Sequence, residues 1–173
     1  YILTGLTGMF SLGQASFMAL GAYAAAVLGK MYAWPFLPCL LVGMVLSVAM
    51  GFLCGYPIMR LRKEYLALVT LCYGEAVVAL LNQSNVTGGA LGMSDIPKHT
   101  TLIVALLFLA VCIFFTRNFR HSKFGRMAIA VKSDELASKS MGINMPAVKM
   151  RSFLCAAGLA GLAGGLYAFY LQY

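Results

Sequence analysis

Charge is scarce in this 173-residue chain. Asp, Glu, Lys and Arg make up 10% of the residues, whereas a soluble domain carries about 25%. Hydrophobic residues make up 61%, and the mean hydropathy is +0.85. A water-soluble globule needs more polar side chains than this to cover its surface. The composition therefore excludes a soluble domain and indicates a protein of the lipid bilayer.

Acidic residues and histidines are few, and the cysteines are unpaired in sequence. The chain has five Asp and Glu, and its two histidines, His99 and His121, fall in loops predicted to lie on opposite faces. Five cysteines are scattered singly through apolar segments, without the spacing of a metal site. No nucleophile lies near a candidate base. We therefore expect no catalytic residue, no metal, no cofactor and no enzyme activity in this chain.

The positive charge does not indicate nucleic-acid binding. The formal net charge is +8, but no basic groove interleaved with aromatic residues is visible. Membrane proteins keep excess Lys and Arg in their cytoplasmic loops, and this explains the charge more simply. The expected surroundings are a lipid bilayer, with no nucleic acid.

Apolar segments dominate the chain, and a membrane-spanning helix needs about 20 mostly apolar residues. We predict one all-α transmembrane bundle over residues 1–173. Because Gly5, Gly8, Gly13 and Gln14 interrupt the first uncharged stretch, a broken or re-entrant segment should precede the first span. The chain starts and ends within apolar stretches, so we expect it to be truncated at both ends. The predicted spans are about 15–32, 34–59, 65–82, 101–116 and 152–173.

The basic residues predict the orientation of these spans. Eleven Lys and Arg, in the 60–63 connection and in the segment 117–151, should lie on one side, whereas Lys30 and Lys98 lie on the other. The richer side is predicted to be cytoplasmic. The 83–100 connection is then exofacial. Its glycine-rich sequence gates the outer mouth, contacts a delivery protein or simply connects two spans; the residues concerned are Thr87, Gly88, Gly89 and Gly92.

Small residues recur every four positions on two of the spans. They are Gly43, Ser47, Gly51 and Gly55 on the second, and Ala157, Gly161 and Gly165 on the fifth. Such faces let helix backbones approach closely in a membrane. They predict a tightly packed bundle, although a helix that slides during transport would use the same kind of surface.

Polar residues within the apolar segments are candidates for a translocation pathway. Glu75 is the one ionisable side chain inside a span, and because a carboxylate in lipid is costly we expect it to face the bundle interior. Asn82 shares its helical face, so the pair forms either a pathway wall or a packing hydrogen bond. Ser11, Gly13 and Gln14 lie in the broken segment, where irregular backbone is tolerated only if buried in protein or lining a cavity. A simple kink is the alternative there.

A short capped helix is predicted within the basic segment. Ser133 suits its N-cap, Asp134 and Glu135 suit its first turn, and Gly142 suits its C-terminal stop. So short a helix is not stable alone in water. Its apolar face should therefore contact a partner protein, unless the helix lies on lipid headgroups. The predicted contact residues are Ser133, Asp134, Glu135, Leu136, Ala137, Met141, Gly142, Ile143 and Asn144.

Three blocks resemble the permease subunits of branched-chain amino-acid ABC importers, the high-affinity leucine, isoleucine and valine type. Residues 8–23 resemble the family's G-x-x-S-x-G-[HQ]-A-x-F-x-x-x-G-A-Y block. Residues 60–75, with the Thr-Gly-Gly of 87–89 and then Gly92, resemble a second block, and residues 124–144 resemble the family's cytoplasmic loop. Together the blocks cover nearly the whole chain in the expected order.

The resemblance implies a transport subunit of the bacterial cytoplasmic (inner) membrane that moves branched-chain amino acids with ATP hydrolysed elsewhere. The implied partners are a second permease subunit, two cytoplasmic ATP-binding subunits and an extracytoplasmic substrate-binding protein. By similarity the segment 133–144 would be the ATPase-coupling helix. A permease of the same family for urea or short-chain amides is one alternative. An ion-coupled secondary transporter, which would need no ATPase, is another.

Overall fold

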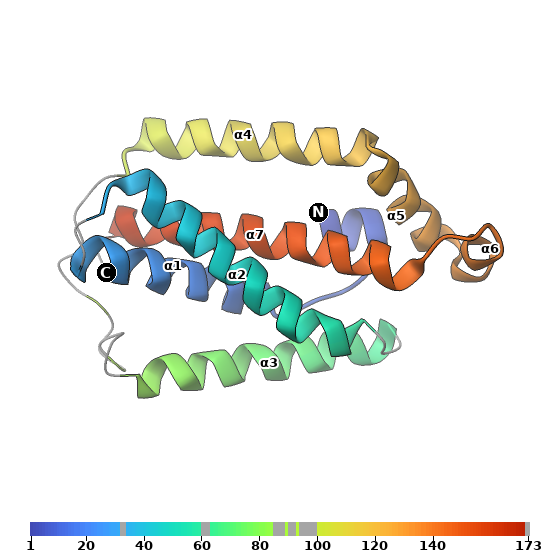
Figure 1. Ribbon diagram of the computed structural model, residues 1–173, viewed down its shortest axis with the longest axis horizontal. Helices are drawn as coiled ribbons and strands as arrows, with labels where there is room; N and C mark the ends of the chain where they lie inside the picture. Colours follow the sequence, from blue (N-terminus) through green and yellow to red (C-terminus); the bar gives the residue numbers. More distant parts are fainter. Residues whose placement is uncertain (32–33, 60–62, 85–88, 90–92, 94–99, 172–173) are drawn as a thin grey trace.

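The computed structural model describes residues 1–31, 34–59, 63–84, 89, 93 and 100–171, and over these residues the fold is a helical bundle (Figure 1). A π-helix, η1 (Ile2–Thr7), is followed by α-helices only, so the predicted all-α class is confirmed for the described part of the chain. The α-helices are α1 (Gln14–Met31), α2 (Phe36–Ile58), α3 (Lys63–Gln83), α4 (Leu102–His121), α5 (Lys123–Ser133), α6 (Glu135–Ser140) and α7 (Met145–Leu171).

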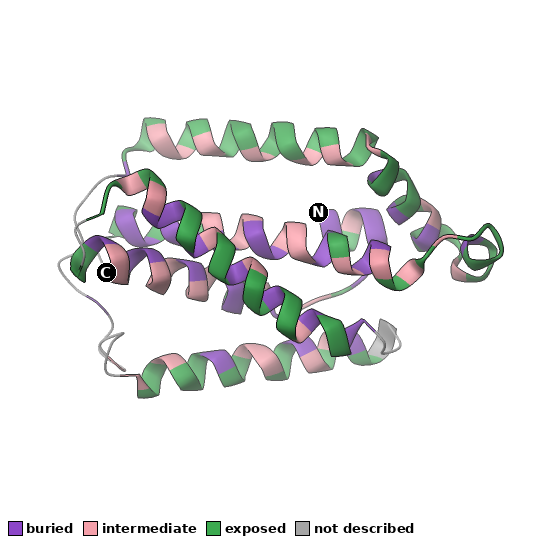
Figure 2. Ribbon diagram, in the orientation of Figure 1, coloured by how far each residue is buried: buried purple, intermediate pink, exposed green. Residues whose placement is uncertain are grey.

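Helices α1, α2 and α7 form the centre of the bundle, where α7 packs along both of the others. Figure 1 shows α3 and α4 on opposite sides of this trio. The fully buried ring of Phe17 on α1 meets Phe153 of α7 edge-on, with 5.5 Å between centroids, and Tyr73 of α3 at 5.6 Å. Helix α4 packs least, since none of its residues is buried (Figure 2).

The small residues predicted to form packing faces are buried between the central helices. A Cβ added to Gly43 of α2 would lie 2.8 Å from the carbonyl oxygen of Gly21 on α1. Ser47 donates its hydroxyl to the Phe17 carbonyl of α1 at 3.0 Å. Backbones this close require small side chains. The prediction of tight packing is confirmed.

We expect a bulky side chain at Gly21 to force α1 away from α7. A Cβ there would already lie 2.5 Å from the Cα of Gly161, so Gly21→Leu should overpack the centre and cost about 1–3 kcal/mol. Thermal denaturation of the detergent-purified protein should show a lower midpoint. Gly74→Ala is the control, because the nearest atom to its added Cβ is the Gly13 Cα at 4.0 Å. Equal midpoints for the two variants would contradict this account.

Helices occupy all five predicted segments, but some end elsewhere than expected. Helix α4 continues past residue 116 to His121, and α7 begins at Met145 instead of residue 152. Asn144, predicted as part of the partner-contacting segment, caps α7, because its side-chain oxygen accepts a first-turn backbone N–H at 3.3 Å. Charged residues do not stop a helix, so these two helices extend beyond their apolar parts.

By length and apolar composition, four of the described helices are able to cross a membrane: α2, residues 65–83 of α3, α4 and α7. Helix α1 is not among them. Its 18 residues extend about 27 Å at 1.5 Å per residue, nearly as far as residues 65–83 of α3, so composition makes the difference: Gln14, Ser16 and Lys30 lower the hydropathy of α1. As predicted, a broken segment precedes it.

The end of α2, the start of α3, and helices α5 and α6 gather at one end of the bundle, which we call the basic end (Figure 1). This agrees with the shared side predicted from their basic residues. Helix α5 was not predicted. Ser122 caps it by accepting the Gly125 N–H at 3.2 Å, and its buried residues recur every three positions: Gly125, Ala128 and Val131.

Candidate functional site

The helical chain is interrupted between η1 and α1, and the interruption is held firmly against α3. Gly8 ends η1 with φ +66°, a left-handed conformation that suits glycine. Leu12 donates its backbone N–H to Thr70 Oγ1 of α3 at 3.1 Å. A Cβ on Gly13 would lie 2.6 Å from the Thr70 carbonyl oxygen. Gly13 therefore allows the close approach of the break to α3.

Ser11 and Gln14, on either side of Gly13, border a polar cavity of about 220 Å³. Residues of η1, the break, α1, α4 and α7 line it, and Thr4 and Thr116 add two more hydroxyls. Ser11 Oγ and Gln14 Nε2 are buried and have no hydrogen-bond partner within the described chain. An unpaired buried polar group costs about 1–3 kcal/mol. These two atoms are therefore suited to a ligand or to water that enters the cavity.

A second, wider pocket lies next to this cavity, toward the basic end. It measures about 510 Å³ and shares Tyr1 and Thr116 with the cavity. Arg117, Arg120 and His121, at the end of α4, line it. In the sequence the two arginines indicated only orientation, although their spacing of three residues just after an apolar segment is a signal for one cationic helix face. We call this pocket the cationic mouth.

Glu75 is exposed on α3, so the prediction that it faces the bundle interior is wrong for the described chain. The buried positions of α3 include Leu66, Thr70 and Val77. Glu75 and Asn82 share a different, exposed face, as their spacing predicted. Neither Glu75 nor Asn82 lines the cavity.

The short helix predicted in the basic segment is α6, but its cap is Asp134 rather than Ser133. Asp134 Oδ1 accepts the backbone N–H groups of Leu136 at 2.8 Å and Ala137 at 3.1 Å. Ser133 instead ends α5, where its hydroxyl bonds to a carbonyl one turn earlier at 3.1 Å. A carboxylate makes the stronger, charge-assisted cap, which moves the helix start by one residue.

Gly142 terminates α6 as predicted, in the left-handed conformation with φ +77°. Its N–H donates to the Lys139 carbonyl at 3.0 Å, and the Ile143 N–H donates to the Ser138 carbonyl at 3.1 Å. This pair of bonds is typical of a helix closed by glycine. Both ends of α6 are therefore defined by local hydrogen bonds.

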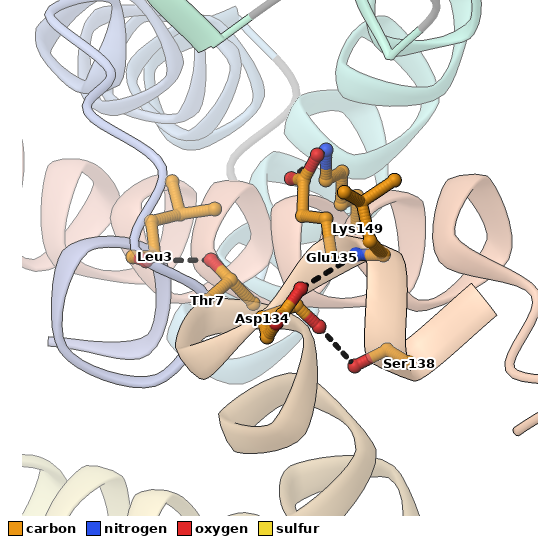
Figure 3. Close-up of polar contacts among 7 residues, drawn as sticks. Leu3, Thr7, Asp134, Glu135, Ser138 and Lys149 are labelled. Atoms are coloured by element: carbon orange, nitrogen blue, oxygen red, sulfur yellow. Dashed lines mark hydrogen bonds and ion pairs between the residues drawn. The ribbon is translucent and has the colours of Figure 1, made fainter. Parts of the chain in front are cut away.

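Helix α6 presents apolar side chains outward at the basic end. Leu136 is 80% exposed and Met141 is 79% exposed. Ser138 is buried on the opposite side, and its hydroxyl donates to the Asp134 carbonyl at 2.7 Å (Figure 3). The face predicted to contact a partner is open in this chain.

Polar contacts between described residues join the α5–α6 region to the rest of the bundle. Glu135 of α6 forms an ion pair with Lys149 of α7 at 2.7 Å, and the lysine side chain is 11% exposed (Figure 3). Lys132 of α5 donates its ammonium to the Gly5 carbonyl of η1 at 2.9 Å. Between these contacts η1, α5 and α7 share a buried cluster of Leu6, Ala128 and Val148.

The glycine-rich connection predicted to be exofacial lies mostly outside the described residues, including Thr87, Gly88 and Gly92. Gly89 is described and has φ +60°, and its N–H donates to the Ser84 carbonyl at 3.1 Å. The role of this connection stays a prediction.

Comparison with known proteins points to membrane transport. A family described as the permease component of branched-chain amino acid transport systems matches residues 1–173. Two similar proteins are the LivM permease proteins of the high-affinity branched-chain amino acid transport systems of Salmonella typhimurium and Escherichia coli. Each is 34% identical over an alignment of 202 positions, gaps included, that covers 96% of this chain and 48% of the relative. A probable branched-chain amino acid transport permease protein LivM of Methanocaldococcus jannaschii is 26% identical over 147 residues, 76% of this chain and 42% of its own. The chain spans about half the length of these relatives, and no solved structure matches it.

Proposed function

Because this chain belongs to the family of permease components of branched-chain amino acid transport systems, we propose that it forms part of the membrane pathway of an ABC importer for branched-chain amino acids. It is a multi-pass protein of the cytoplasmic membrane and a transport component rather than an enzyme. In this proposal residues 1–173 are one permease domain with five spans, of which α1 is the fifth beside the four helices that are apolar enough to cross a membrane. The segment 117–151 is its cytoplasmic coupling loop. Neither the fold nor the relatives favour a urea or amide permease or an ion-coupled transporter.

The observation that carries the proposal is the geometry of α6. A six-residue helix with both ends capped carries Leu136, and Met141 follows directly after it; both side chains are largely exposed. Exposed apolar side chains on the predicted cytoplasmic side are suited to a soluble partner that covers them. We assign that partner to an ATP-binding subunit, one of two in the importer. The basic end is then the cytoplasmic end.

The contacts of α6 supply a route by which movement of that subunit reaches the membrane helices. The Glu135–Lys149 ion pair attaches α6 to α7, which packs along both α1 and α2. The Lys132–Gly5 hydrogen bond attaches α5 to η1, which forms part of the wall of the polar cavity. A displacement of α6 by the ATPase would therefore move both the central helix and the cavity wall.

We place Ser11 and Gln14 on the translocation pathway because they face the polar cavity, with Gly13 holding the break against α3. We assign Glu75 and Asn82 to a surface that the second permease subunit covers, since a carboxylate exposed on a spanning helix is costly in lipid. The end of α3 and the start of α4, between which the glycine-rich 83–100 connection runs in the sequence, lie at the opposite end from α6 (Figure 1). That end is the proposed docking side of the substrate-binding protein.

Affinity purification of the full-length protein from native membranes tests this function. We expect stoichiometric recovery of a second permease subunit and two ATP-binding subunits, and uptake of leucine, isoleucine and valine that stops when ATP is depleted. Collapsing the proton gradient while ATP is maintained is the control, and it should leave uptake intact. Recovery without any ATPase, together with uptake that survives ATP depletion, would refute the proposal.

A further inference from the structure

We propose that the Ser11–Gln14 cavity binds the carboxylate of the amino acid in transit, and that this amino acid leaves toward the cytoplasm through the cationic mouth. This inference rests on the proposed function and specifies which group of the substrate the chain recognises. Its basis is the coincidence of unpaired buried donors, apolar walls and adjacent arginines around two neighbouring pockets that share Tyr1 and Thr116.

The polar atoms of the cavity match a carboxylate. Gln14 Nε2 is a donor and Ser11 Oγ can donate, and both are buried without a partner in the described chain. No acidic side chain lines the cavity among the described residues. Two donors that converge on an anion make charge-assisted hydrogen bonds, which are roughly twice as strong as neutral ones. A carboxylate has two acceptor oxygens and so can accept a hydrogen bond from each of these groups.

The size and depth of the cavity suit an aliphatic amino acid. Its volume of about 220 Å³ equals that of roughly seven water molecules at about 30 Å³ each. Leu3 and Leu159 supply apolar wall beside the hydroxyls. Leu159 lies near the middle of α7, about 21 Å from its first residue at 1.5 Å per residue. Transporters commonly bind substrate at this depth, beside a discontinuous helix.

The cationic mouth gives the path a direction. Arg117 and Arg120 line the wider pocket that shares Thr116 with the cavity, on the side of the basic end. A pocket lined by charges of one sign raises the local concentration of an oppositely charged ligand. A carboxylate released from Ser11 and Gln14 would therefore meet the arginines next, before it reaches the cytoplasm.

Cysteine modification in the assembled full-length transporter tests the proposal. In inside-out vesicles, with the native cysteines replaced by serine, Ser11→Cys should react about tenfold faster with an anionic methanethiosulfonate reagent than with a cationic one of similar size. Adding Arg117→Gln and Arg120→Gln should bring the two rates close together. Leucine should protect the thiol, whereas leucinamide, which lacks the carboxylate, should not. Thr116→Cys on the loosely packed α4 repeats the test if Ser11→Cys does not assemble.

Leu12→Cys is the matched control, because Leu12 is 49% exposed and does not line the cavity. Its thiol should not be protected by leucine, and it should not show an arginine-dependent preference for the anionic reagent. Equal rates for the two reagents at Ser11→Cys, or equal protection by leucine and leucinamide, would overturn the proposal. If the transporter still assembles with its ATPases and imports leucine, that result leaves the proposed function intact. If the purified transporter without these substitutions contains no ATPase subunit, the proposed function itself is refuted.

Discussion

Leu136→Asp should abolish ATP-driven uptake while the bundle stays folded. Leu136 is 80% exposed, and substitutions at such positions usually change stability by less than about 0.5 kcal/mol. In the complex the same side chain is proposed to be covered by the ATP-binding subunit. Placing a carboxylate in that contact should cost about 2 kcal/mol or more, roughly a thirtyfold loss of affinity. Uptake by vesicles and recovery of ATPase in a pull-down measure the effect.

Two variants make this first prediction specific. Leu136→Met keeps an apolar side chain of similar volume and should retain most uptake. Lys123→Asp places a carboxylate on the exposed first residue of α5, away from α6, and should not release the ATPase. If Leu136→Asp assembles and transports as the parent does, α6 is not the docking helix. An unchanged denaturation midpoint is needed to attribute the loss to docking.

Lys149→Met should uncouple ATP hydrolysis from transport, because it removes the ion pair that attaches α6 to α7. The pair spans 2.7 Å, with the Lys149 side chain 11% exposed and the Glu135 side chain 33% exposed. Removing one partner leaves a partly buried charge behind, at a cost of about 1–3 kcal/mol after allowance for solvent screening. We expect uptake to fall about tenfold, as a loss near 1.4 kcal/mol would give, while ATPase activity persists. Paired uptake and hydrolysis rates in proteoliposomes measure this.

The reciprocal exchange separates the ion pair from the shape of either residue. Glu135→Lys combined with Lys149→Glu restores opposite charges across the same contact and should recover much of the uptake lost in each single variant. Faster hydrogen exchange in α6 of Lys149→Met would show that the helix is released from α7. Impaired single variants without recovery in the exchange would mean that the two residues act separately.

Much of the fold follows from local rules that are legible in the sequence. Apolar length predicted the helical segments, and the spacing of Gly43, Ser47, Gly51 and Gly55 predicted the packing face of α2. Glycines predicted the break before α1, and Gly142 predicted the stop of α6. Each of these depends on helix period or on φ freedom over a few residues, so no distant contact is needed to infer them.

The wrong predictions concern positions where two neighbouring residues are both suitable helix caps, or where the burial of a side chain depends on how a neighbouring helix packs. Ser133 and Asp134 are both good caps, and only the backbone hydrogen bonds identify the carboxylate as the cap. Glu75 was expected inside because a charge in lipid is costly, but the buried positions of α3 lie on another face. The cost to Glu75 holds for the assembled protein, where the second permease subunit is proposed to cover it.

Composition, periodicity and caps act within a few turns, so the sequence was enough to infer the class of protein, the helical segments and the short capped helix at the basic end. It also singled out Ser11 and Gln14 as polar residues at a break. The packing of the helices was needed to show that these two residues border a cavity together with residues of α4 and α7, and that Arg117 and Arg120 line the pocket beside it. It likewise joined Glu135 to Lys149, and Lys132 to Gly5 across more than a hundred residues. Such contacts depend on which helices pack against one another, because the spacing within one helix indicates its packing face but not its partner.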